Sequence, residues 1–280
     1  MTGYDWQSFL ARWDADAMGV HVRALRRGGI AEPAEGGRRS ALLQIAQGLG
    51  TEIPASLLEP LREGGSDADV VTEAQRRIAA IEALLLPGLR AHRPNDKLFD
   101  DDYHWAVIRN GGHFHAPAED AAITAAEKRL GSMLPASYKD FLRVSNGWIT
   151  ISSWIAPIES TGWLRDKGPS WIENFGGANQ NREASLRWHA IYGKEQDPPR
   201  YHRAYLQKCL QLSEPLAEEN CVFLLNPAVV FEDDDWESWF LASWLAGAVR
   251  YKSFYELMDW MKATDLRELG KADADGNALR

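Results

Sequence analysis

The sequence lacks most features of secreted, membrane-spanning or metal-bound proteins. Its cysteines, Cys209 and Cys221, are too few for a disulfide scaffold or a zinc ribbon, so we expect two buried thiols in a reducing compartment. It has no run of about 18 or more apolar residues, and residues 1–11 have no basic head followed by an apolar stretch. These absences predict a cytoplasmic protein without a membrane partner.

Positive charge is also scarce. The 280 residues include 31 Lys and Arg against 40 Asp and Glu, a formal net charge of -9, which disfavours binding to nucleic acid and favours a basic partner. The sequence contains no phosphate loop, dinucleotide glycine fingerprint, nucleophile elbow or zinc-protease helix. We therefore predict a non-enzymatic protein with no cofactor, and an unrecognised enzyme is the less favoured alternative.

Apolar and aromatic residues, in contrast, are plentiful. Hydrophobic residues make up 45% of the chain, which suggests one large or two modest domains, and we take two. Most of the 12 tryptophans lie in the second half. Because Trp is common both in cores and at the centres of protein interfaces, composition alone does not separate these two roles.

Residues 1–100 read as a helical extension. Two stripes recur at helical spacing, one in residues 6–17 and one in residues 70–85, and Pro87-Gly88 is expected to end the second helix. Residues 101–118 mix Pro, Gly, Asp and His and predict an exposed polar connector with a small hairpin at Asn110-Gly111. His113 and His115 share one side of such a strand, but their spacing is weak evidence for a metal, and we predict none.

The second half has a sharper pattern. Two short helices are expected over residues 119–130 and 135–142, the first ended by Gly131 and the second by Asn146-Gly147. Strands follow at residues 221–225, 236–244 and 249–251, and the second carries aromatics on both faces, which predicts cover on both sides. Ser253 and Glu256 form a capping-box pattern at the start of the last helix.

These helices and strands resemble the SUKH superfamily, the Smi/Knr-type domain. The helical part of the resemblance lies in Ile123, Glu127, Leu130, Gly131, Leu134, Pro135, Tyr138, Phe141, Leu142, Asn146 and Gly147. The remainder lies in the strand at residues 221–225, the acidic turn 232–235, the strand at 236–244 and the closing helix. The boundaries that follow are a helical N-terminal extension over 1–100, a connector over 101–118, a SUKH domain over 119–265 and a flexible tail over 266–280.

The resemblance implies an α+β fold, a twisted and mainly antiparallel sheet with flanking helices. Many bacterial domains of this kind resemble immunity proteins that bind and neutralise a toxin, and fungal relatives are regulatory scaffolds. We therefore expect a non-catalytic protein-binding module whose partner is a cognate, basic bacterial toxin domain. A regulatory scaffold with several clients is the alternative, and the oligomeric state stays open.

Two groups of residues are candidates for partner binding. The acidic run Asp233, Asp234, Asp235 and Glu237 would be either a solvated turn or a negative lip that attracts a cationic toxin. Trp148, Trp163, Trp171 and Glu173 lie in or beside segments rich in turn formers, and would form either an interface or a flap over the sheet. Glu127 is expected to make a structural hydrogen bond or ion pair.

Overall fold

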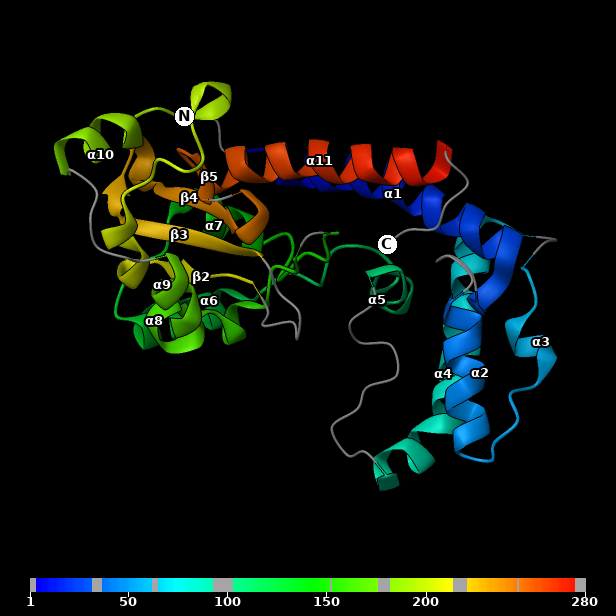
Figure 1. The fold of residues 1–280 in the computed structure, drawn as a ribbon. Coiled ribbons are helices and arrows are strands. Elements are labelled where there is room, and N and C mark those ends of the chain that lie inside the picture. The colour runs from blue at the N-terminus through cyan, green and yellow to red at the C-terminus, as the bar shows by residue number, and fades with distance from the viewer. Residues whose placement is uncertain are drawn as a thin grey trace. The chain divides into compact units, whose positions relative to one another are not determined.

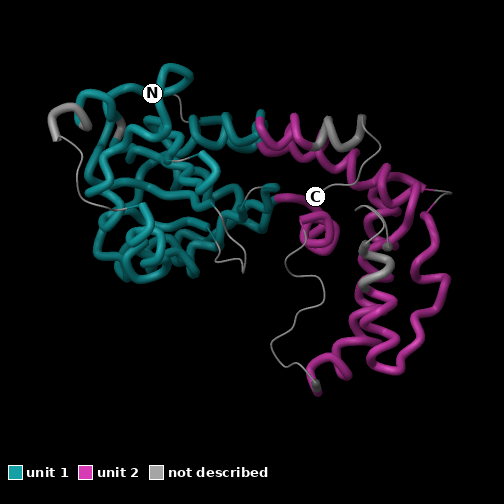
Figure 2. Tube along the Cα trace, viewed as in Figure 1, with its two compact units in different colours: residues 1–9, 114–263 teal, residues 10–113, 264–280 magenta. Residues whose placement is uncertain are grey.

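The computed structural model describes residues 4–31, 37–61, 65–92, 103–151, 153–175, 182–213, 221–245 and 247–274. The chain divides into two compact units (Figure 2). Unit 1 comprises Met1–Phe9 and Phe114–Ala263, and unit 2 comprises Leu10–His113 and Thr264–Arg280. In the described residues, no helix is long and apolar enough to cross a membrane.

Helices dominate the first part of the chain and a sheet the last part (Figure 1). The α-helices are α1 (Trp6–Gly28), α2 (Gly37–Gly48), α3 (Ala55–Leu58), α4 (Asp67–His92), α5 (Tyr103–Asn110), α6 (Asp120–Leu130), α7 (Ala136–Leu142), α8 (Leu164–Lys167), α9 (Pro169–Phe175), α10 (Arg182–His189) and α11 (Phe254–Ala274). The strands are β1 (Gly162–Trp163), β2 (Leu210–Gln211), β3 (Cys221–Val230), β4 (Trp236–Ala242) and β5 (Gly247–Tyr251). The short 3-10 helices are η1 (Gly29–Ala31), η2 (Ile158–Ser160), η3 (Gly193–Glu195), η4 (Arg203–Lys208), η5 (Glu232–Asp234) and η6 (Ser243–Leu245).

The five strands of unit 1 form one antiparallel sheet in the order β1-β2-β3-β4-β5. This confirms the predicted α+β class. Because side chains alternate between the faces of a strand, Val222 and Trp239 pack in the cluster that α8, α9 and η4 cover. Phe240 points the other way, with its ring 5.5 Å from that of Trp260 on α11. Every residue of β4 is buried, so the predicted cover on both sides is confirmed.

The edge strand β5 is protected from unwanted pairing. The Ala248 N–H donates to the Pro198 carbonyl at 2.9 Å. The Gln196 side chain bonds both backbone groups of Arg250, at 2.5 Å and 2.9 Å. Gly247 fits this contact because a Cβ there would lie 2.0 Å from the Pro198 carbonyl oxygen. The segment 196–198 thus occupies the place of a sixth strand and covers the exposed edge.

Two helix ends follow the predicted capping, whereas α7 ends at Leu142 with Arg143 as its C-cap, before the predicted Asn146-Gly147. Gly131 adopts the left-handed conformation, with φ of 67°, at the end of α6. At the start of α11, Ser253 Oγ accepts the Glu256 N–H at 3.1 Å, and Glu256 Oε2 accepts the Lys252 N–H at 3.1 Å. This reciprocal bonding confirms the capping box. Helix α11 continues to Ala274 because Leu266, Arg267 and Glu268 favour helix, so the tail predicted from residue 266 is helical that far. Residues 275–280 lie outside the described part.

Unit 2 has its own helical core. Both predicted stripes are buried. Unit 2 contains Leu10, Trp13 and Ala17 of α1 and Val70, Ala74, Ile78, Ile81 and Leu85 of α4, whereas Trp6 and Phe9 of α1 belong to unit 1. Two expectations were wrong. Helix α4 does not end at Pro87 but reaches His92, with Leu89 buried in its last turns. The hairpin expected at Asn110-Gly111 is absent because residues 103–110 form α5, whose residues 103–108 are all buried.

Candidate functional site

The end of β3 and the turn that leads to β4 carry part of the acidic run, and we call residues 227–234 the arm. The strand register shifts between Asn226 and Val230, so the ladder is interrupted where the arm leaves the sheet. Ala228 is exposed and Val230 is 53% exposed, although both are apolar. Glu232 and Asp234 are exposed at the tip. The arm therefore presents apolar side chains directly beside carboxylates.

The acidic run is split between solvent and interior. Asp235 is buried, and its Oδ1 accepts the Ser137 N–H at 2.8 Å, which satisfies a backbone donor in the first turn of α7. Glu237 is fully buried. The Asp233 side chain lies outside the described residues. In contrast, the Asp234 side chain is exposed to solvent. Its backbone is left-handed, with φ of 59°, in the turn that precedes β4.

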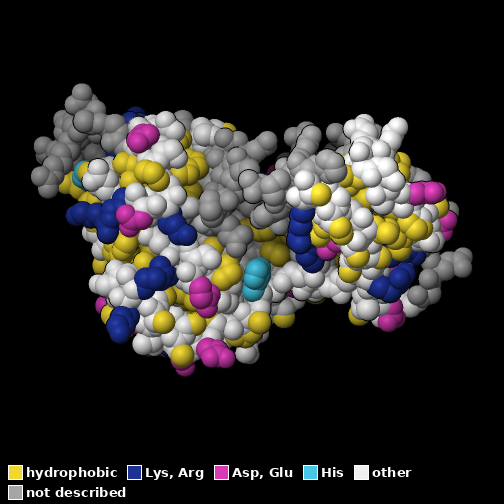
Figure 3. Space-filling view, turned by 90° about the horizontal axis from the view of Figure 1, so that it is seen from below, with side chains coloured by type: hydrophobic (Ala, Val, Ile, Leu, Met, Phe, Trp, Pro, Cys, Tyr) yellow, Lys and Arg dark blue, Asp and Glu magenta, His cyan; other side chains and the backbone are white. Residues whose placement is uncertain are grey.

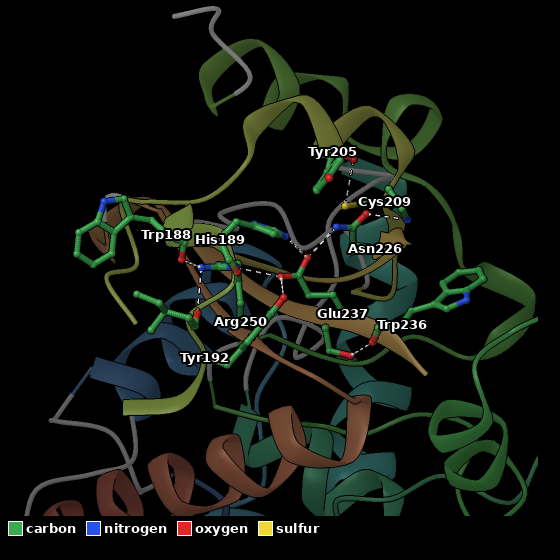
Figure 4. Close-up of polar contacts among 12 residues, drawn as sticks. Trp188, His189, Tyr192, Tyr205, Cys209, Asn226, Trp236, Glu237 and Arg250 are labelled. Atoms are coloured by element: carbon green, nitrogen blue, oxygen red, sulfur yellow. Dashed lines mark hydrogen bonds and ion pairs between the residues drawn. The ribbon is translucent and has the colours of Figure 1, made fainter. Parts of the chain in front are cut away.

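Beneath the arm lies a buried polar cluster that the strand register assembles (Figure 4). Asn226 of β3 stands opposite Glu237 of β4, and Trp239 of β4 stands opposite Arg250 of β5. Since Glu237 and Trp239 share one face of β4, the carboxylate and the guanidinium meet diagonally on that face. Arg250 Nη1 lies 3.0 Å from Glu237 Oε1 and both side chains are fully buried.

Glu237 has further partners that offset its burial. The Asn226 amide donates to Oε2 at 2.8 Å, and the Tyr192 hydroxyl donates to Oε1 at 3.0 Å. His189 Nε2 lies 3.0 Å from Oε2. Burial by itself would raise the pKa of Glu237, but the contacts with His189 and the charge of Arg250 hold that pKa below its ordinary value. The carboxylate therefore stays ionised inside the unit.

Arg250 ties a surface segment to this cluster. Its guanidinium donates to the carbonyls of Trp188 at 3.1 Å, Ile191 at 3.2 Å and Arg200 at 3.4 Å, and also to that of His189. Figure 4 shows Trp188 and His189 beside the Arg250 guanidinium. A single side chain thus satisfies four carbonyls of a segment with little regular structure, and this fixes the course of residues 188–200.

The arm and the polar cluster are mechanically linked. Phe231, within the arm, packs edge to face on Tyr192, and the centres of the two rings lie 5.2 Å apart. The same Tyr192 donates to Glu237. In addition, the Phe231 N–H bonds the Asp235 carbonyl at 2.8 Å. The exposed arm is therefore held on a rigid base, which lowers the entropy lost when a partner binds.

The other sequence candidates lie in different surroundings. Trp148 is fully buried, with its ring 5.2 Å from that of Phe114, so it belongs to the interior. Trp163 is half-buried beneath Arg165, whose guanidinium lies 5.4 Å from the ring. Trp171 is half-buried against the core cluster and stacks on Phe175, whereas Glu173 is exposed. These residues are not brought together with the arm's acidic tip into one contact.

The remaining candidates have backbone partners. Glu127 Oε1 accepts the Leu134 N–H at 2.9 Å and lies 3.5 Å from Lys139 Nζ. The side-chain Oδ1 of Asn146 accepts the Ile158 N–H at 2.8 Å. Glu127 of α6 thus connects the two helices of the pair, and Asn146 connects the end of the pair to the following segment. Figure 3 shows one face of the molecule, where acidic and basic side chains are interspersed rather than gathered by sign.

Unit 2 holds a separate buried chain of histidines. Asp14 Oδ1 lies 2.7 Å from His113 Nδ1, His113 Nε2 lies 3.2 Å from His21 Nε2, and His21 Nδ1 lies 2.7 Å from His104 Nδ1. Tyr103 Oη is 3.0 Å from His113 Nε2. The expectation of an exposed connector was wrong for His104 and His113, because both are packed inside unit 2.

At neutral pH, the hydrogen-bond partners determine which nitrogen of each histidine donates and which accepts. The Asp14 carboxylate only accepts, so His113 donates from Nδ1 and, being neutral, accepts at Nε2 from His21. His21 then accepts at Nδ1 from His104. Burial, followed by the neighbouring imidazoles, lowers the pKa of His21. Burial also lowers that of His113, and Asp14 partly offsets the shift. In the part of the chain that the structure describes, no group of His, Cys, Asp or Glu could hold a metal ion.

Sequence reasoning found Glu237 but not its partners. One signal was available, because Glu237 and Arg250 are charged residues in otherwise apolar strands, and strands covered on both sides require such charges to be paired. Nothing local pointed to His189 or Tyr192, which lie 48 and 45 positions from Glu237 in the chain.

A comparison with protein families matches the model of the SMI1 / KNR4 family (SUKH-1) to residues 117–259. The chain belongs to this family. No curated protein and no solved structure is significantly similar to it. The SUKH-1 match includes the helical pair, the whole sheet, the arm and the start of α11, whereas α1 to α5 lie outside it.

Proposed function

We propose that this SUKH-1 protein is a non-catalytic immunity protein that binds and neutralises a cognate, basic toxin domain in the cytoplasm of a bacterium. The observation that carries the proposal is the arm, where the exposed apolar Val230 stands beside the exposed carboxylates Glu232 and Asp234 on a rigid base. SUKH domains generally act through protein–protein contacts, which agrees with such a surface.

The two chemistries of the arm would have separate effects on binding. The carboxylates attract a cationic partner from a distance and mainly raise the association rate, an effect that salt screens. Val230 contributes apolar area that is lost from water only in the complex, so it mainly slows dissociation. A partner held in this way would show salt-dependent association and salt-tolerant dissociation.

The test is a binding measurement with catalytically disabled products of genes adjacent to the one encoding this chain. The variant Glu232→Gln/Asp234→Asn removes two charges, and Asn tolerates the left-handed backbone at position 234. We expect association to slow by roughly threefold to tenfold and its salt dependence to weaken. Val230→Ser should speed dissociation. Glu195→Gln, an exposed carboxylate on η3, is the control and should change neither rate.

A second candidate is a regulatory scaffold with several clients. It rests on unit 2, which lies outside the SUKH-1 match and has a separate core. Recovery of one tight, salt-sensitive basic partner would support the immunity function. Recovery of several weaker partners that bind unit 2 would reject it in favour of the scaffold.

A further inference from the structure

A second surface of unit 1 lies at the opposite end of β4 from the arm. There, the turn η6 between β4 and β5 exposes Trp244, which is 57% exposed and the most exposed aromatic side chain among the described residues. β4 has seven residues, so the two ends are about 20 Å apart. This surface is therefore distinct from the arm.

Trp244 belongs to a continuous set of aromatic rings. Its ring lies 6.1 Å from that of Phe240, which lies 5.5 Å from Trp260, which in turn lies 6.2 Å from Tyr251. Phe240 is buried, whereas Trp260 and Tyr251 are half-buried. We call Trp244, Tyr251 and Trp260 the aromatic shelf. Rings from a turn, a strand and a helix thus form one apolar face above a buried ring.

Carboxylates border the shelf. Glu256 and Asp259 on α11 are exposed. Glu256 lies one helical turn before Trp260 on α11, so the two side chains are on one side of the helix, and Asp259 directly precedes Trp260. In agreement, burial, followed by the charges of these two groups, raises the pKa of Tyr251 to about 12. Two basic residues also lie in this stretch of the chain: Lys252, which is exposed and directly follows Tyr251, and Lys262, whose Nζ lies 4.8 Å from the centre of the Phe9 ring.

Aromatic faces beside carboxylates suit one kind of group. A guanidinium or ammonium ion is attracted by the negative face of an indole and by the carboxylates, whereas an anion is repelled by both. Trp is also the residue most enriched at the energetic centres of interfaces. An exposed Trp with acidic neighbours therefore fits a basic protein segment better than an acidic or purely apolar one.

We propose that the aromatic shelf, with Glu256 and Asp259, is a docking surface for a basic segment of a protein partner, and that an Arg or Lys side chain stacks on Trp244. This inference rests on the proposed binding function and adds a second contact to it. With the arm, the shelf would give the partner two separated anchors, which increases both affinity and selectivity.

The experiment is an NMR titration of the full-length, nitrogen-15-labelled chain with a tetra-arginine amide, using tetra-citrulline amide as the uncharged control peptide. We expect the indole N–H signals of Trp244 and Trp260, assigned with Trp substitutions, to shift with the arginine peptide, and less so at high salt. Equal shifts with citrulline, or shifts confined to other tryptophans, would overturn the proposal.

Matched variants separate charge, aromaticity and folding. Trp244→Ala and Trp244→Leu should both weaken the arginine peptide at least about fivefold, because Leu keeps apolar area but has no aromatic face. Asp259→Asn should weaken it about twofold to fivefold. Trp188→Ala removes another exposed Trp and should have no effect, as should Asp166→Asn. If Trp244→Leu binds as well as the parent chain, cation stacking is refuted.

The outcomes distinguish this inference from the proposed function. A product of an adjacent gene that binds the Trp244→Ala variant as tightly as the parent chain refutes the shelf as a docking site and leaves the immunity function intact. If no such product binds, the proposed function fails, while the arginine titration still reports on the shelf. Since Trp244 is more than half exposed, its substitution should leave urea unfolding unchanged.

Discussion

Replacement of Arg250 by Met tests whether the buried cluster holds unit 1 together. The substitution keeps the side chain's apolar stem but removes the cation 3.0 Å from Glu237 and the donors to four carbonyls of residues 188–200. Both partners of the ion pair are fully buried. Glu237 would keep its contacts with Asn226, Tyr192 and His189 but would lose the permanent charge that favours its ionised form.

The expected loss is large. Removal of one partner from a buried ion pair costs about 3–5 kcal/mol, and each carbonyl that water does not reach adds about 1–3 kcal/mol. We expect at least about 4 kcal/mol in total, a large part of the stability of an ordinary domain. Arg200→Met is the matched control. That guanidinium is exposed and lies 4.4 Å from the Trp188 ring, so its loss should cost less than about 1 kcal/mol.

Amide hydrogen exchange is the assay, because two units need not unfold in a single transition. Exchange in β4 and β5 should accelerate strongly in Arg250→Met and stay close to the parent rate in Arg200→Met. Adding Glu237→Gln to Arg250→Met removes the uncompensated charge, so the double variant should be more stable than the two single losses predict. A loss below about 1 kcal/mol for Arg250→Met, or strictly additive losses, would refute this account.

Three further predictions concern pH and backbone packing. The pKa of Glu237 is lowered in the folded protein, so its contribution to stability is present above its unfolded-state pKa of about 4.3 and disappears as pH falls through its folded-state pKa. Urea unfolding between pH 3 and pH 6 should show this pH dependence, and Glu237→Gln should reduce it. The pKa values of His21 and His113 are lowered in the folded protein, so below about pH 6.5 the unfolded chain takes up protons that the folded chain does not. The free energy of unfolding of unit 2 should therefore fall by up to about 1.4 kcal/mol per pH unit for each histidine. Amide exchange in α1 and α5 that does not change from pH 7 to pH 5 would contradict this. Gly247→Ala should destabilise unit 1 by more than about 2 kcal/mol because the new Cβ would clash with the Pro198 backbone. Gly131→Ala should cost only about 1–2 kcal/mol, because the backbone there is left-handed but the Cβ would enter open space. A thermal melt of each variant measures the difference.

Much of unit 1 could be predicted from the sequence because local rules decide it. Helix α6 is specified by its apolar spacing and by Gly131, and the start of α11 by Ser253 and Glu256, all within a few residues of one another. The alternation in β4 predicts cover on both faces for the same reason. Together these patterns carry the resemblance to the SUKH superfamily before any coordinates are known, and the family match to SUKH-1 agrees with it.

Burial and long-range pairing depended on the tertiary structure. The acidic run reads as one continuous charged segment, yet Asp235 and Glu237 are buried while Asp234 is exposed. Asp235 is buried because it bonds the backbone of Ser137 on α7, and Glu237 because it stands opposite Asn226 in a sheet that is covered on both faces. Likewise, Arg250 meets residues 188–200, and His113 meets Asp14, across separations that no local spacing records. Local periodicity determined which elements form, whereas the register and packing of distant segments determined which charged and aromatic side chains reach the surface.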